Sequence, residues 1–446
     1  MSINEKKASD KASELAIKYA SLYGGKVEIA PKVPVRDLSD FSVWYTPGVA
    51  AVSSAIHKDK SLSFEYTGRW NTIAIITDGS RVLGLGDIGP EAATPVMEGK
   101  SLIFKFLGGI DAVPLSIGVH KIDEIIQFVQ AVEPAFAGIN LEDISSPKCF
   151  EILDTLRKSL DIPVWHDDQQ GTAGVTFAGL INALKVTGRP LRGTQIVLYG
   201  AGAANIATAR LLIVAGCDPG DILLVDSKGI LHPERDDIDV LSIRHKAKYE
   251  LAIKTNVNRK SGGLSEALKG AEVLIAASHP GPNAFDKGLI QTMNKDPIVF
   301  LLANPVPELW PSEAEQNGAK VVATGRSDFP NQVNNSLLFP AIFRGVLDVR
   351  ARSITDEMVI AAAEEIAKFA EETGLSSTHI LPTMLDLEVY ARVSAKVGEK
   401  AIELGLARKN LSGEELKLTA SRIISRSRKF MSSMIESKFI QVPDSS

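Results

Sequence analysis

A glycine-rich turn between a predicted strand and a predicted helix constrains the fold of this chain more than any other feature. The apolar run 195–199 reads as a buried strand, GAGAAN fills positions 200–205, and the apolar helix that follows ends at Gly216. Asp226 stands about twenty residues beyond the turn, at the end of the next apolar run. Together these features predict a Rossmann-type unit that binds a dinucleotide.

Each small residue of the turn has a physical role in that interpretation. Gly200 permits the tight turn, Gly202 lets the backbone approach a pyrophosphate, and Ala204 allows the helix to pack closely on the strand. The free N–H groups at the start of the helix attract the anion. A turn with a structural role alone is the alternative. We expect NAD or NADP to be contacted by Gly200, Gly202, Ala203, Ala204, Asn205, Asp226 and Lys228.

Apolar runs of strand length recur on both sides of the turn, at 72–76, 135–139, 162–165, 222–226, 272–278, 298–304 and 320–324. Runs that are apolar throughout are typical of strands buried on both faces of a parallel sheet. The predicted fold class is therefore α/β, and the run 169–188 reads as one of its helices, closed by Gly188.

The chain divides into three predicted parts. Residues 1–165 form an N-terminal α/β domain, which opens with an amphipathic helix and an irregular Pro-rich stretch up to about residue 70. Residues 166–350 form a Rossmann-type domain with a doubly wound parallel sheet. Residues 351–446 read as a helical C-terminal segment that packs on both.

Four carboxylates follow two of the predicted strands. Glu142 and Asp143 come after one strand, and Asp167 and Asp168 come after the next. Since one helix separates the two strands, their carboxyl ends are expected at the same sheet edge, where ligands of α/β proteins collect. Four acidic groups there repel one another unless they are protonated or hold a cation. Oxygen ligands suit Mg²⁺ or Mn²⁺ better than Zn²⁺, and capping of the following helices is the alternative.

Amide-rich segments end two strands of the second unit. Asn304 follows one of them, and the segment 324–335, TGRSDFPNQVNN, is too polar and irregular to be core. Side chains of this kind suit a small, carboxylated substrate. A plain surface loop is the alternative for the second segment.

The overall composition narrows the class of protein. The 54 acidic and 49 basic side chains give a net charge of −5, which is no basis for binding nucleic acid. No apolar run approaches the roughly 18 residues of a membrane-spanning helix, and the N-terminus lacks the apolar core of a signal peptide. Two cysteines, Cys149 and Cys217, are too few for a disulfide framework. We expect a cytoplasmic enzyme that acts on a small molecule.

Seven segments, taken in order, resemble the malic enzyme family in its short prokaryotic form. They are WYTPGVA (44–50), LGLGDIGPEAATPVMEGKSLIFK (83–105), INLEDI (139–144), GTAG (171–174), GAGAAN (200–205), ANPVPE (303–308) and TGRSDFPNQVNN (324–335). The resemblance runs from roughly Asp37 to residue 370. It implies oxidation and decarboxylation of malate to pyruvate, with reduction of NAD or NADP and a requirement for Mg²⁺ or Mn²⁺.

The resemblance also implies a role for individual residues. Tyr45 is implied as the general acid and Lys100 as the general base, which must be neutral to accept a proton, so its pKa is expected to fall. The first domain is then the catalytic one. The implied metal ligands are Glu142, Asp143 and Asp168, supported by Asp167, and the implied contacts to substrate or nicotinamide are Arg81, Asn304, Asn334 and Asn335.

Several alternatives stay open at this point. A malolactic-type enzyme would use the same site and release lactate, and a non-decarboxylating hydroxy-acid dehydrogenase would need no metal. A nicotinamide-sensing module would bind the cofactor without turnover. Asp226 favours NAD, whereas Lys228 favours NADP, so we expect use of both cofactors. The family makes a homodimer the default assembly.

Overall fold

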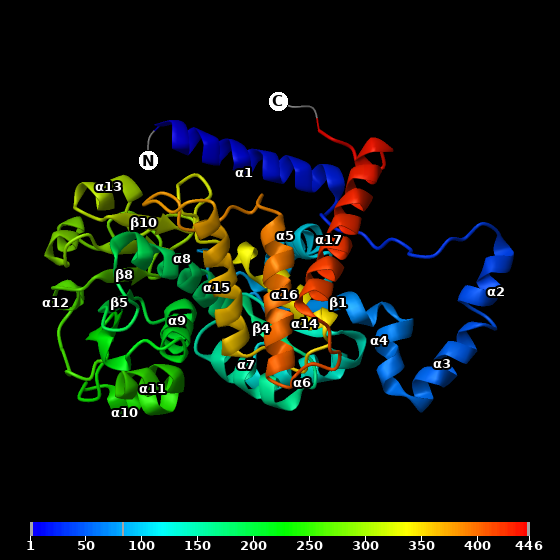
Figure 1. Ribbon diagram of the computed structural model, residues 1–446, viewed down its shortest axis with the longest axis horizontal. Coiled ribbons are helices and arrows are strands. Elements are labelled where there is room, and N and C mark those ends of the chain that lie inside the picture. The colour runs from blue at the N-terminus through cyan, green and yellow to red at the C-terminus, as the bar shows by residue number, and fades with distance from the viewer. Residues whose placement is uncertain (1–2, 83, 444–446) are drawn as a thin grey trace.

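Two parallel sheets form the centre of the chain, and helices surround them (Figure 1). This computed structural model describes residues 3–82 and 84–443, with only the backbone described for 3–10. The first sheet has the strand order β2-β1-β3-β4 and is parallel throughout. Its strands are β1 (Thr72–Thr77), β2 (Asp111–Ser116), β3 (Gly138–Leu141) and β4 (Val164–His166).

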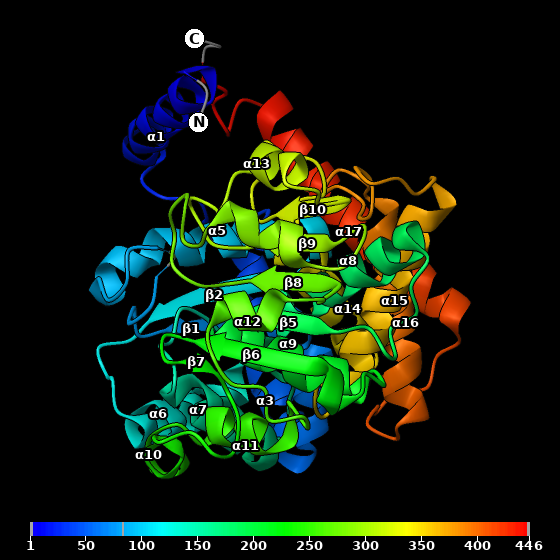
Figure 2. The ribbon, with the colours of Figure 1, turned by 90° about the vertical axis from the view of Figure 1, so that its left-hand side faces the viewer.

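The second sheet has the order β10-β9-β8-β5-β6-β7, and Figure 2 shows its strands stacked in this sequence. Its five longer strands are parallel, and the short β7 pairs with β6 in the antiparallel sense. The sheet confirms the predicted Rossmann-type arrangement. Its strands are β5 (Ile196–Tyr199), β6 (Ile222–Asp226), β7 (Gly229–Ile230), β8 (Val273–Ala276), β9 (Ile298–Leu301) and β10 (Val321–Thr324).

Helices connect the strands and cover both sheets. Those that bear on the site are α5 (Gly89–Gly108), α7 (Lys148–Ser159), η5 (Asp167–Gly171), α8 (Thr172–Thr187) and α9 (Ala203–Val214). The helix predicted at 169–188 begins two residues earlier as the π-helical turn η5, and Gly188 ends it in the left-handed conformation with φ of 69°. Gly188 therefore confirms the predicted C-cap.

The C-terminal part is helical, as predicted, and contains α15 (Asp356–Glu372), α16 (Glu388–Glu403) and α17 (Gly413–Glu436). Helix α14 (Phe339–Asp348) precedes it, at the end of the predicted Rossmann-type domain, and packs on α5 of the first unit. The Phe104 ring of α5 lies 4.6 Å from that of Phe339 and 5.3 Å from that of Phe343. Ser427 of α17 donates a hydrogen bond of 2.8 Å to the carbonyl oxygen of Lys105.

The N-terminal residues lie outside this body. Helix α1 (Ile3–Tyr23) runs beside the end of α17, while α2 (Phe41–Trp44), α3 (Val49–Lys58) and α4 (Ser63–Tyr66) form an arm that projects away from the sheets (Figure 1). The stretch predicted to be irregular thus contains three short helices. We call residues 38–66 the arm below.

The structure differs from the predicted strands in three places. The strand expected at 135–139 is β3, three residues later, because the 3-10 turn η4 (Glu133–Ala135) occupies the start of that run. Strand β2 was not predicted, since Pro114 interrupts its pattern; β2 lies at the sheet edge, where proline is tolerated. The two-residue strand β7 was also missed. Both cysteines are buried and unpaired, as expected.

Among the helices that the structure describes, none combines the length and apolar character needed to cross a membrane.

Candidate functional site

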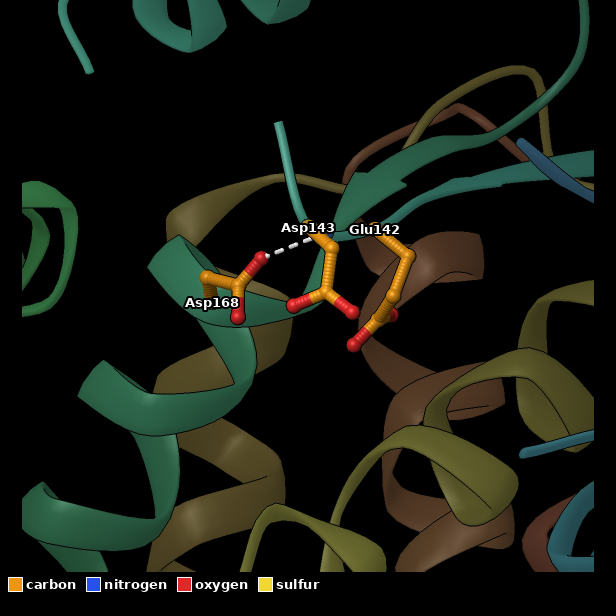
Figure 3. A group of neighbouring side chains, drawn as sticks. All are labelled: Glu142, Asp143 and Asp168. Carbon is orange, nitrogen blue, oxygen red and sulfur yellow. Dashed lines mark hydrogen bonds between the residues drawn. The ribbon is translucent and has the colours of Figure 1, made fainter. Parts of the chain in front are cut away.

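Three of the predicted carboxylates meet at the carboxyl ends of β3 and β4. Each of Glu142, Asp143 and Asp168 offers a carboxylate oxygen, and these oxygens lie within 4.8 Å of one another (Figure 3). The backbone N–H of Asp143 donates a hydrogen bond of 2.9 Å to Asp168 Oδ2. Asp143 has a φ of 53°, a left-handed conformation that is uncommon outside glycine. These three carboxylates therefore lie together at one sheet edge, as the strand ends predicted.

Lys100 from α5 reaches into the same cluster. Its Nζ donates to Glu142 Oε1 at 2.6 Å and to Asp167 Oδ2 at 2.5 Å, and it lies 4.6 Å from the centre of the Phe339 ring. Lys100, Glu142 and Asp167 are all buried. A buried charge is stable only when it is paired, and here one ammonium group faces several carboxylates.

This charge balance corrects the expected direction of one pKa. Burial alone would lower the pKa of Lys100, but the carboxylates of Asp167 and Glu142 outweigh it, so the pKa is raised. Burial raises the pKa of Glu142 well above its usual range, and the charges of Asp167, Asp168 and Asp143 add to this effect against the influence of Lys100. The site thus holds more negative charge than Lys100 neutralises. Clustered hard oxygen ligands with excess negative charge fit a divalent cation such as Mg²⁺ or Mn²⁺.

Asp167 is held by donors on several sides. Its Oδ1 accepts a hydrogen bond of 2.9 Å from Trp165 Nε1, and its Oδ2 accepts from Asn335 as well as from Lys100. A Cβ atom added at Gly171 would lie 2.1 Å from Asp167 Oδ1. The π-helical turn therefore needs a glycine there, and its two adjacent carboxylates serve different partners.

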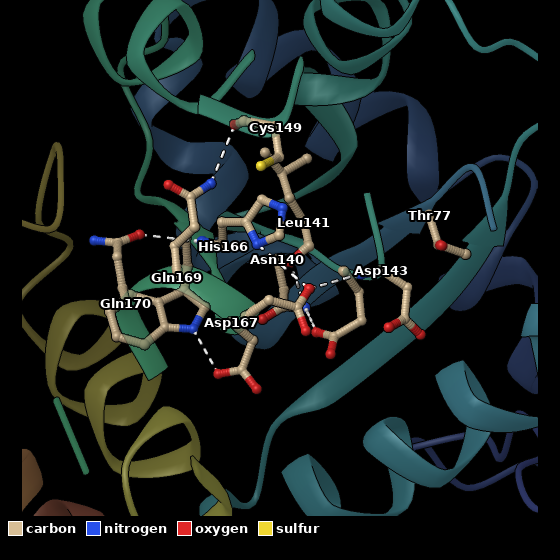
Figure 4. Close-up of polar contacts among 12 residues, drawn as sticks. Thr77, Asn140, Leu141, Asp143, Cys149, His166, Asp167, Gln169 and Gln170 are labelled. Carbon is tan, nitrogen blue, oxygen red and sulfur yellow. Dashed lines mark hydrogen bonds and ion pairs between the residues drawn. The ribbon is translucent and has the colours of Figure 1, made fainter. Parts of the chain in front are cut away.

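Side-chain amides hold the turn η5, which carries Asp167 and Asp168, to neighbouring elements (Figure 4). Gln170 Oε1 accepts from the backbone N–H of His166 at 3.1 Å, and Gln169 Nε2 donates to the carbonyl of Cys149 at 3.1 Å. Asn140 Nδ2 donates to Glu142 Oε2 at 2.8 Å. These amides fix η5 to β4 and α7 and hold one carboxylate of the cluster in place.

The glycine-rich turn has the geometry that the sequence predicted. Gly200 has a φ of 95°, and a Cβ added there would lie 2.3 Å from the carbonyl oxygen of Ala277, so only glycine fits. A Cβ added at Gly202 would meet nothing within 4 Å. Ala203 begins α9, with Ala204 in its first turn, and α9 packs on η5. The glycine-rich turn therefore lies next to η5, the turn that carries Asp167 and Asp168.

The side chain of Asn205 contacts the backbone of its own chain. Its buried Nδ2 donates to the carbonyl oxygens of Tyr199 and Gly200, both at 2.9 Å, and its backbone N–H lies in the first turn of α9. The side chain thus ties the turn to β5. A cofactor contact by Asn205 stays a prediction.

Asp226 ends β6, where the sequence placed it, but its carboxylate is already engaged. Arg235 Nη1 and the backbone N–H of Lys228 each donate to Oδ1 at 2.9 Å, and Lys248 Nζ donates to Oδ2 at 3.0 Å. Burial opposes ionisation, yet the hydrogen bond from Arg235 with those from Lys228 and Lys248 holds the pKa of Asp226 below its usual value.

The four residues predicted to contact the substrate have different surroundings relative to the carboxylate cluster. Asn335 contacts Asp167, and the backbone N–H of Arg81 donates to the carbonyl of Asp143 at 3.0 Å, which sets both beside the cluster. Asn304 is exposed, and a Cβ added at Gly84 would lie 2.8 Å from its carbonyl oxygen. Asn334 instead caps a turn, since its Oδ1 accepts from the N–H of Ser336 at 3.0 Å.

Tyr45 is not brought to the cluster by its own chain. Its side chain is 68% exposed, and it directly follows α2, which Figure 1 shows far to one side of β4. The motif that contains Tyr45 therefore lies on the projecting arm.

The sequence patterns did not indicate every residue that shapes the site. Trp165 and Asn140 hold carboxylates of the cluster, and Lys248 holds Asp226. Trp165 stands two residues before Asp167, and Asn140 two before Glu142; each lies in the strand that its carboxylate follows. That spacing of two is a signal that a strand-based reading could have used.

Two family models match the chain. The model described as "Malic enzyme, N-terminal domain" matches residues 24–157, and the model described as "Malic enzyme, NAD binding domain" matches residues 169–402. Together the two matches include Glu142, Asp143 and the whole glycine-rich turn, but not Asp168.

Relatives of known name match over most of this chain. The bifunctional malic/malolactic enzyme of Bacillus subtilis (strain 168) is 47% identical over 392 residues, which are 88% of this chain and 93% of that enzyme. The NAD-dependent malic enzyme of Geobacillus stearothermophilus is 48% identical over 387 residues, 87% of this chain and 79% of the relative. The NADP-dependent malic enzyme of Rhizobium meliloti (strain 1021) is 40% identical over 417 residues, 90% of this chain and 53% of the relative.

A solved structure gives the same picture. The crystal structure of Entamoeba histolytica malic enzyme superimposes with a TM-score of 0.94 at 44% sequence identity, and the match covers 99% of this chain and 92% of that one.

Proposed function

The chain belongs to the malic enzyme family, and on that premise we propose that it oxidises and decarboxylates (S)-malate to pyruvate and carbon dioxide, with reduction of NAD or NADP. The observation that carries the proposal is the contact of Lys100 with Glu142 and Asp167 beside the three-carboxylate cluster. A plain dinucleotide-binding protein has no need for a buried lysine in a group of acidic residues. A base next to a cation site is the arrangement that metal-assisted oxidation and decarboxylation of a hydroxy acid uses.

We propose that Glu142, Asp143 and Asp168 hold Mg²⁺ or Mn²⁺. Their oxygens lie close enough together to share one ion, and burial, followed by the charges of the neighbouring carboxylates, raises the pKa of Glu142. A cation would offset both effects. When bound, the cation supplies Lewis-acid chemistry, because it lowers the pKa of a chelated hydroxyl and polarises the carbonyl of a β-keto acid.

Lys100 would take the proton of the malate hydroxyl while the hydride on C2 passes to the nicotinamide. A lysine accepts a proton only when it is neutral, and the negative charge of Glu142 and Asp167 now favours the ammonium form. Neutralising Glu142 by a cation removes one of these two influences and lowers the pKa of Lys100. Asp167, fixed by Trp165 and Asn335, would keep the amine in position throughout.

The carbon–carbon bond to the C4 carboxylate would break next, releasing carbon dioxide and leaving an enolate. Tyr45 would return a proton to C3, which yields pyruvate. Because Tyr45 lies on the arm, away from its own cluster, we propose a homodimer in which the arm of one copy completes the site of the other. The exposed apolar side chains of the arm support this proposal: Leu38, Phe41, Val43, Trp44, Val49 and Val52.

Mixing two inactive variants tests the dimer. Tyr45→Phe and Lys100→Ala would each abolish most activity, but a mixed dimer holds one site with both wild-type residues. Random exchange of subunits should restore about a quarter of wild-type activity. No recovery, in a sample whose mixed dimers are shown by mass spectrometry, would place Tyr45 in its own chain's site or outside the reaction.

Product analysis tests the function itself. The purified full chain is incubated with malate, Mn²⁺ and either NAD or NADP, and reduced cofactor, pyruvate, carbon dioxide and lactate are measured together. We expect reduced cofactor, pyruvate and carbon dioxide in equal amounts, and no turnover in excess EDTA. Reduced cofactor without carbon dioxide would show a plain hydroxy-acid dehydrogenase, and full turnover in EDTA would exclude the metal.

A malolactic activity is the second candidate, because the Bacillus subtilis relative is named a bifunctional malic/malolactic enzyme. In that reaction the reduced cofactor stays bound and reduces pyruvate to lactate. Lactate that forms without free reduced cofactor would favour it.

A further inference from the structure

The end of β6 carries a group of charges that the reaction does not use. Asp226 is only 8% exposed, and three positively charged groups surround it and its neighbour Asp237. Arg235 lies between the two carboxylates: its Nη1 is 2.9 Å from Asp226 Oδ1, and its Nε is 2.8 Å from Asp237 Oδ1. Lys228 Nζ lies 3.1 Å from Asp237 Oδ2, and Lys248 completes the group.

Asp226 has little capacity left for a ligand. A carboxylate offers about four lone-pair positions, and donors from Arg235, Lys248 and the backbone of Lys228 already occupy both of its oxygens. In a Rossmann unit the carboxylate at this position accepts hydrogen bonds from the ribose hydroxyls of NAD and repels the additional phosphate of NADP. In this chain its charge is matched and its oxygens are taken, so it is poorly placed for either task.

The group as a whole is positive. Three cations face two carboxylates, and the side chain of Lys228 is 64% exposed at the surface of the group. His245 lies next to Lys248 and adds no charge near neutral pH, because burial and Lys248 lower its pKa to about 4. Glu234 is exposed and pairs with Arg259, so its charge is directed elsewhere. A phosphate on the adenosine ribose would meet net positive charge.

We propose that Arg235 sets the cofactor preference of this chain, because it withdraws Asp226 from the ribose and so favours NADP over NAD. This inference rests on the proposed function for the identity of the cofactor. It sharpens the sequence-based expectation, which balanced Asp226 against Lys228 alone and predicted use of both cofactors. Arg235 acts here as a positioning residue, since its effect passes through Asp226.

Nucleotide binding tests the inference without turnover. Adenosine 2′,5′-bisphosphate and 5′-AMP stand in for the adenosine halves of NADP and NAD, and calorimetry gives their affinities for the full chain without malate or metal. We expect the bisphosphate to bind the wild type at least about tenfold more tightly. Arg235→Gln should reduce that ratio about tenfold or more, whereas Arg244→Gln, which removes an exposed arginine of α10 (Ile238–Arg244), should leave it unchanged.

A rescue experiment separates the role of Arg235 from a structural one. If Arg235 works by neutralising Asp226, the double variant Asp226→Asn, Arg235→Gln should recover most of the ratio that Arg235→Gln loses. A ratio that stays low in the double variant would overturn the proposal, as would equal wild-type affinity for the two nucleotides. Loss of both affinities in parallel, with an earlier thermal unfolding, would show a merely structural residue and would also overturn it.

The outcome is distinguishable from a failure of the proposed function. A chain that binds the bisphosphate tightly but leaves malate unchanged would contradict the proposed reaction and leave the role of Arg235 intact. A chain that decarboxylates malate equally well with NAD and NADP would contradict the role of Arg235 and leave the proposed reaction intact.

Discussion

The carboxylate cluster and the glycine-rich turn both lie at the ends of parallel strands, but they are built in different ways. The cluster depends on charged side chains from distant parts of the chain, from Lys100 to Asn335. The turn depends on the backbone of six adjacent residues and on the absence of a side chain at Gly200. The residues of the turn are therefore adjacent in sequence, although the carbonyl oxygen of Ala277 is what excludes a side chain at Gly200. The residues of the cluster meet only once the chain has folded.

The two regions also differ in how far the chain itself pairs their polar and charged groups. The turn needs only a backbone conformation, which Asn205 stabilises from within. The cluster carries more negative charge than Lys100 balances, so its pKa values depend on what else it binds. The polar groups of the turn are thus paired within the chain, whereas the cluster keeps negative charge that Lys100 does not match.

Removing Lys100 should have the largest effect. Lys100→Ala eliminates the proposed base and leaves Glu142 and Asp167 without their cation, so kcat should fall by about 10²–10⁴-fold. Lys105→Ala is the matched control, because Lys105 is on the same helix but pairs with Asp111 outside the cluster. An effect of equal size in the control would mean that α5, and not the amine, is responsible.

Asp168→Asn tests whether the charged site is independent of the turn. It removes one negative charge from the cluster, and the affinity for Mn²⁺ should fall by about a hundredfold. Binding of NADP, followed by the quenching of protein fluorescence, should stay within about twofold of wild type, because the two sites share no side chain. If NADP affinity fell in parallel, the distinction between the sites would be wrong.

Gly200→Ala makes the converse test. Its added Cβ would lie 2.3 Å from the carbonyl oxygen of Ala277 and would require a positive φ, so the turn has to shift. We expect affinity for NADP to fall about tenfold, with unchanged affinity for Mn²⁺. Gly202→Ala is the control for the fold, since its Cβ meets nothing within 4 Å; only the approach of the cofactor should then suffer.

The smallest predicted effect concerns the junction between the two α/β units. His245 Nε2 lies 3.2 Å from Ser146 Oγ, and burial, followed by Lys248, lowers its pKa from 6.5 to about 4. As the pH falls, the imidazole of His245 is therefore protonated in the unfolded chain at a higher pH than in the folded chain. The stability that His245 contributes is fully present above pH 6.5 and is lost as the pH falls towards 4.

Replacing His245 by asparagine, which can also cap a helix, should remove that loss. Chemical denaturation gives the free energy of unfolding at pH 7 and at pH 4.5. This free energy should decrease between the two pH values in both proteins, and the decrease should be about 1 kcal/mol smaller in His245→Asn than in wild type. The exposed His279→Asn is the control. An identical decrease in all three proteins would show that His245 is not protonated differently in the folded chain.

Local patterns predicted most of the fold, and the reason lies in particular elements. Strands β5, β6, β9 and β10 are apolar runs bounded by turn residues, so they stood out. Strand β2 did not, because Pro114 breaks its pattern and is tolerated only at an edge that the sequence does not mark. The boundary of β3 moved because tertiary pairing, not composition, decides where a strand begins.

The sequence predicted which carboxylates gather at the sheet edge, but not the contacts that they make there. Strand-end reasoning brought Glu142, Asp143 and Asp168 together. It could not show that Lys100 would lie between two carboxylates, which reverses the expected direction of its pKa. The engagement of Asp226 by Arg235 was equally hidden, since an ion pair depends on side-chain geometry that no spacing rule specifies.

The packing of α5 makes the first sheet dependent on helices from the end of the chain. Phe104 needs Phe339 and Phe343 to be covered, and the carbonyl of Lys105 needs Ser427. The strands of the first sheet are complete at residue 166, but the cover of α5 is complete only when residue 427 has been added. The N-terminal part of the chain therefore cannot bury its own apolar surface. A fragment ending near residue 165 would expose the apolar face of α5 and, for that reason, should aggregate when it is expressed alone.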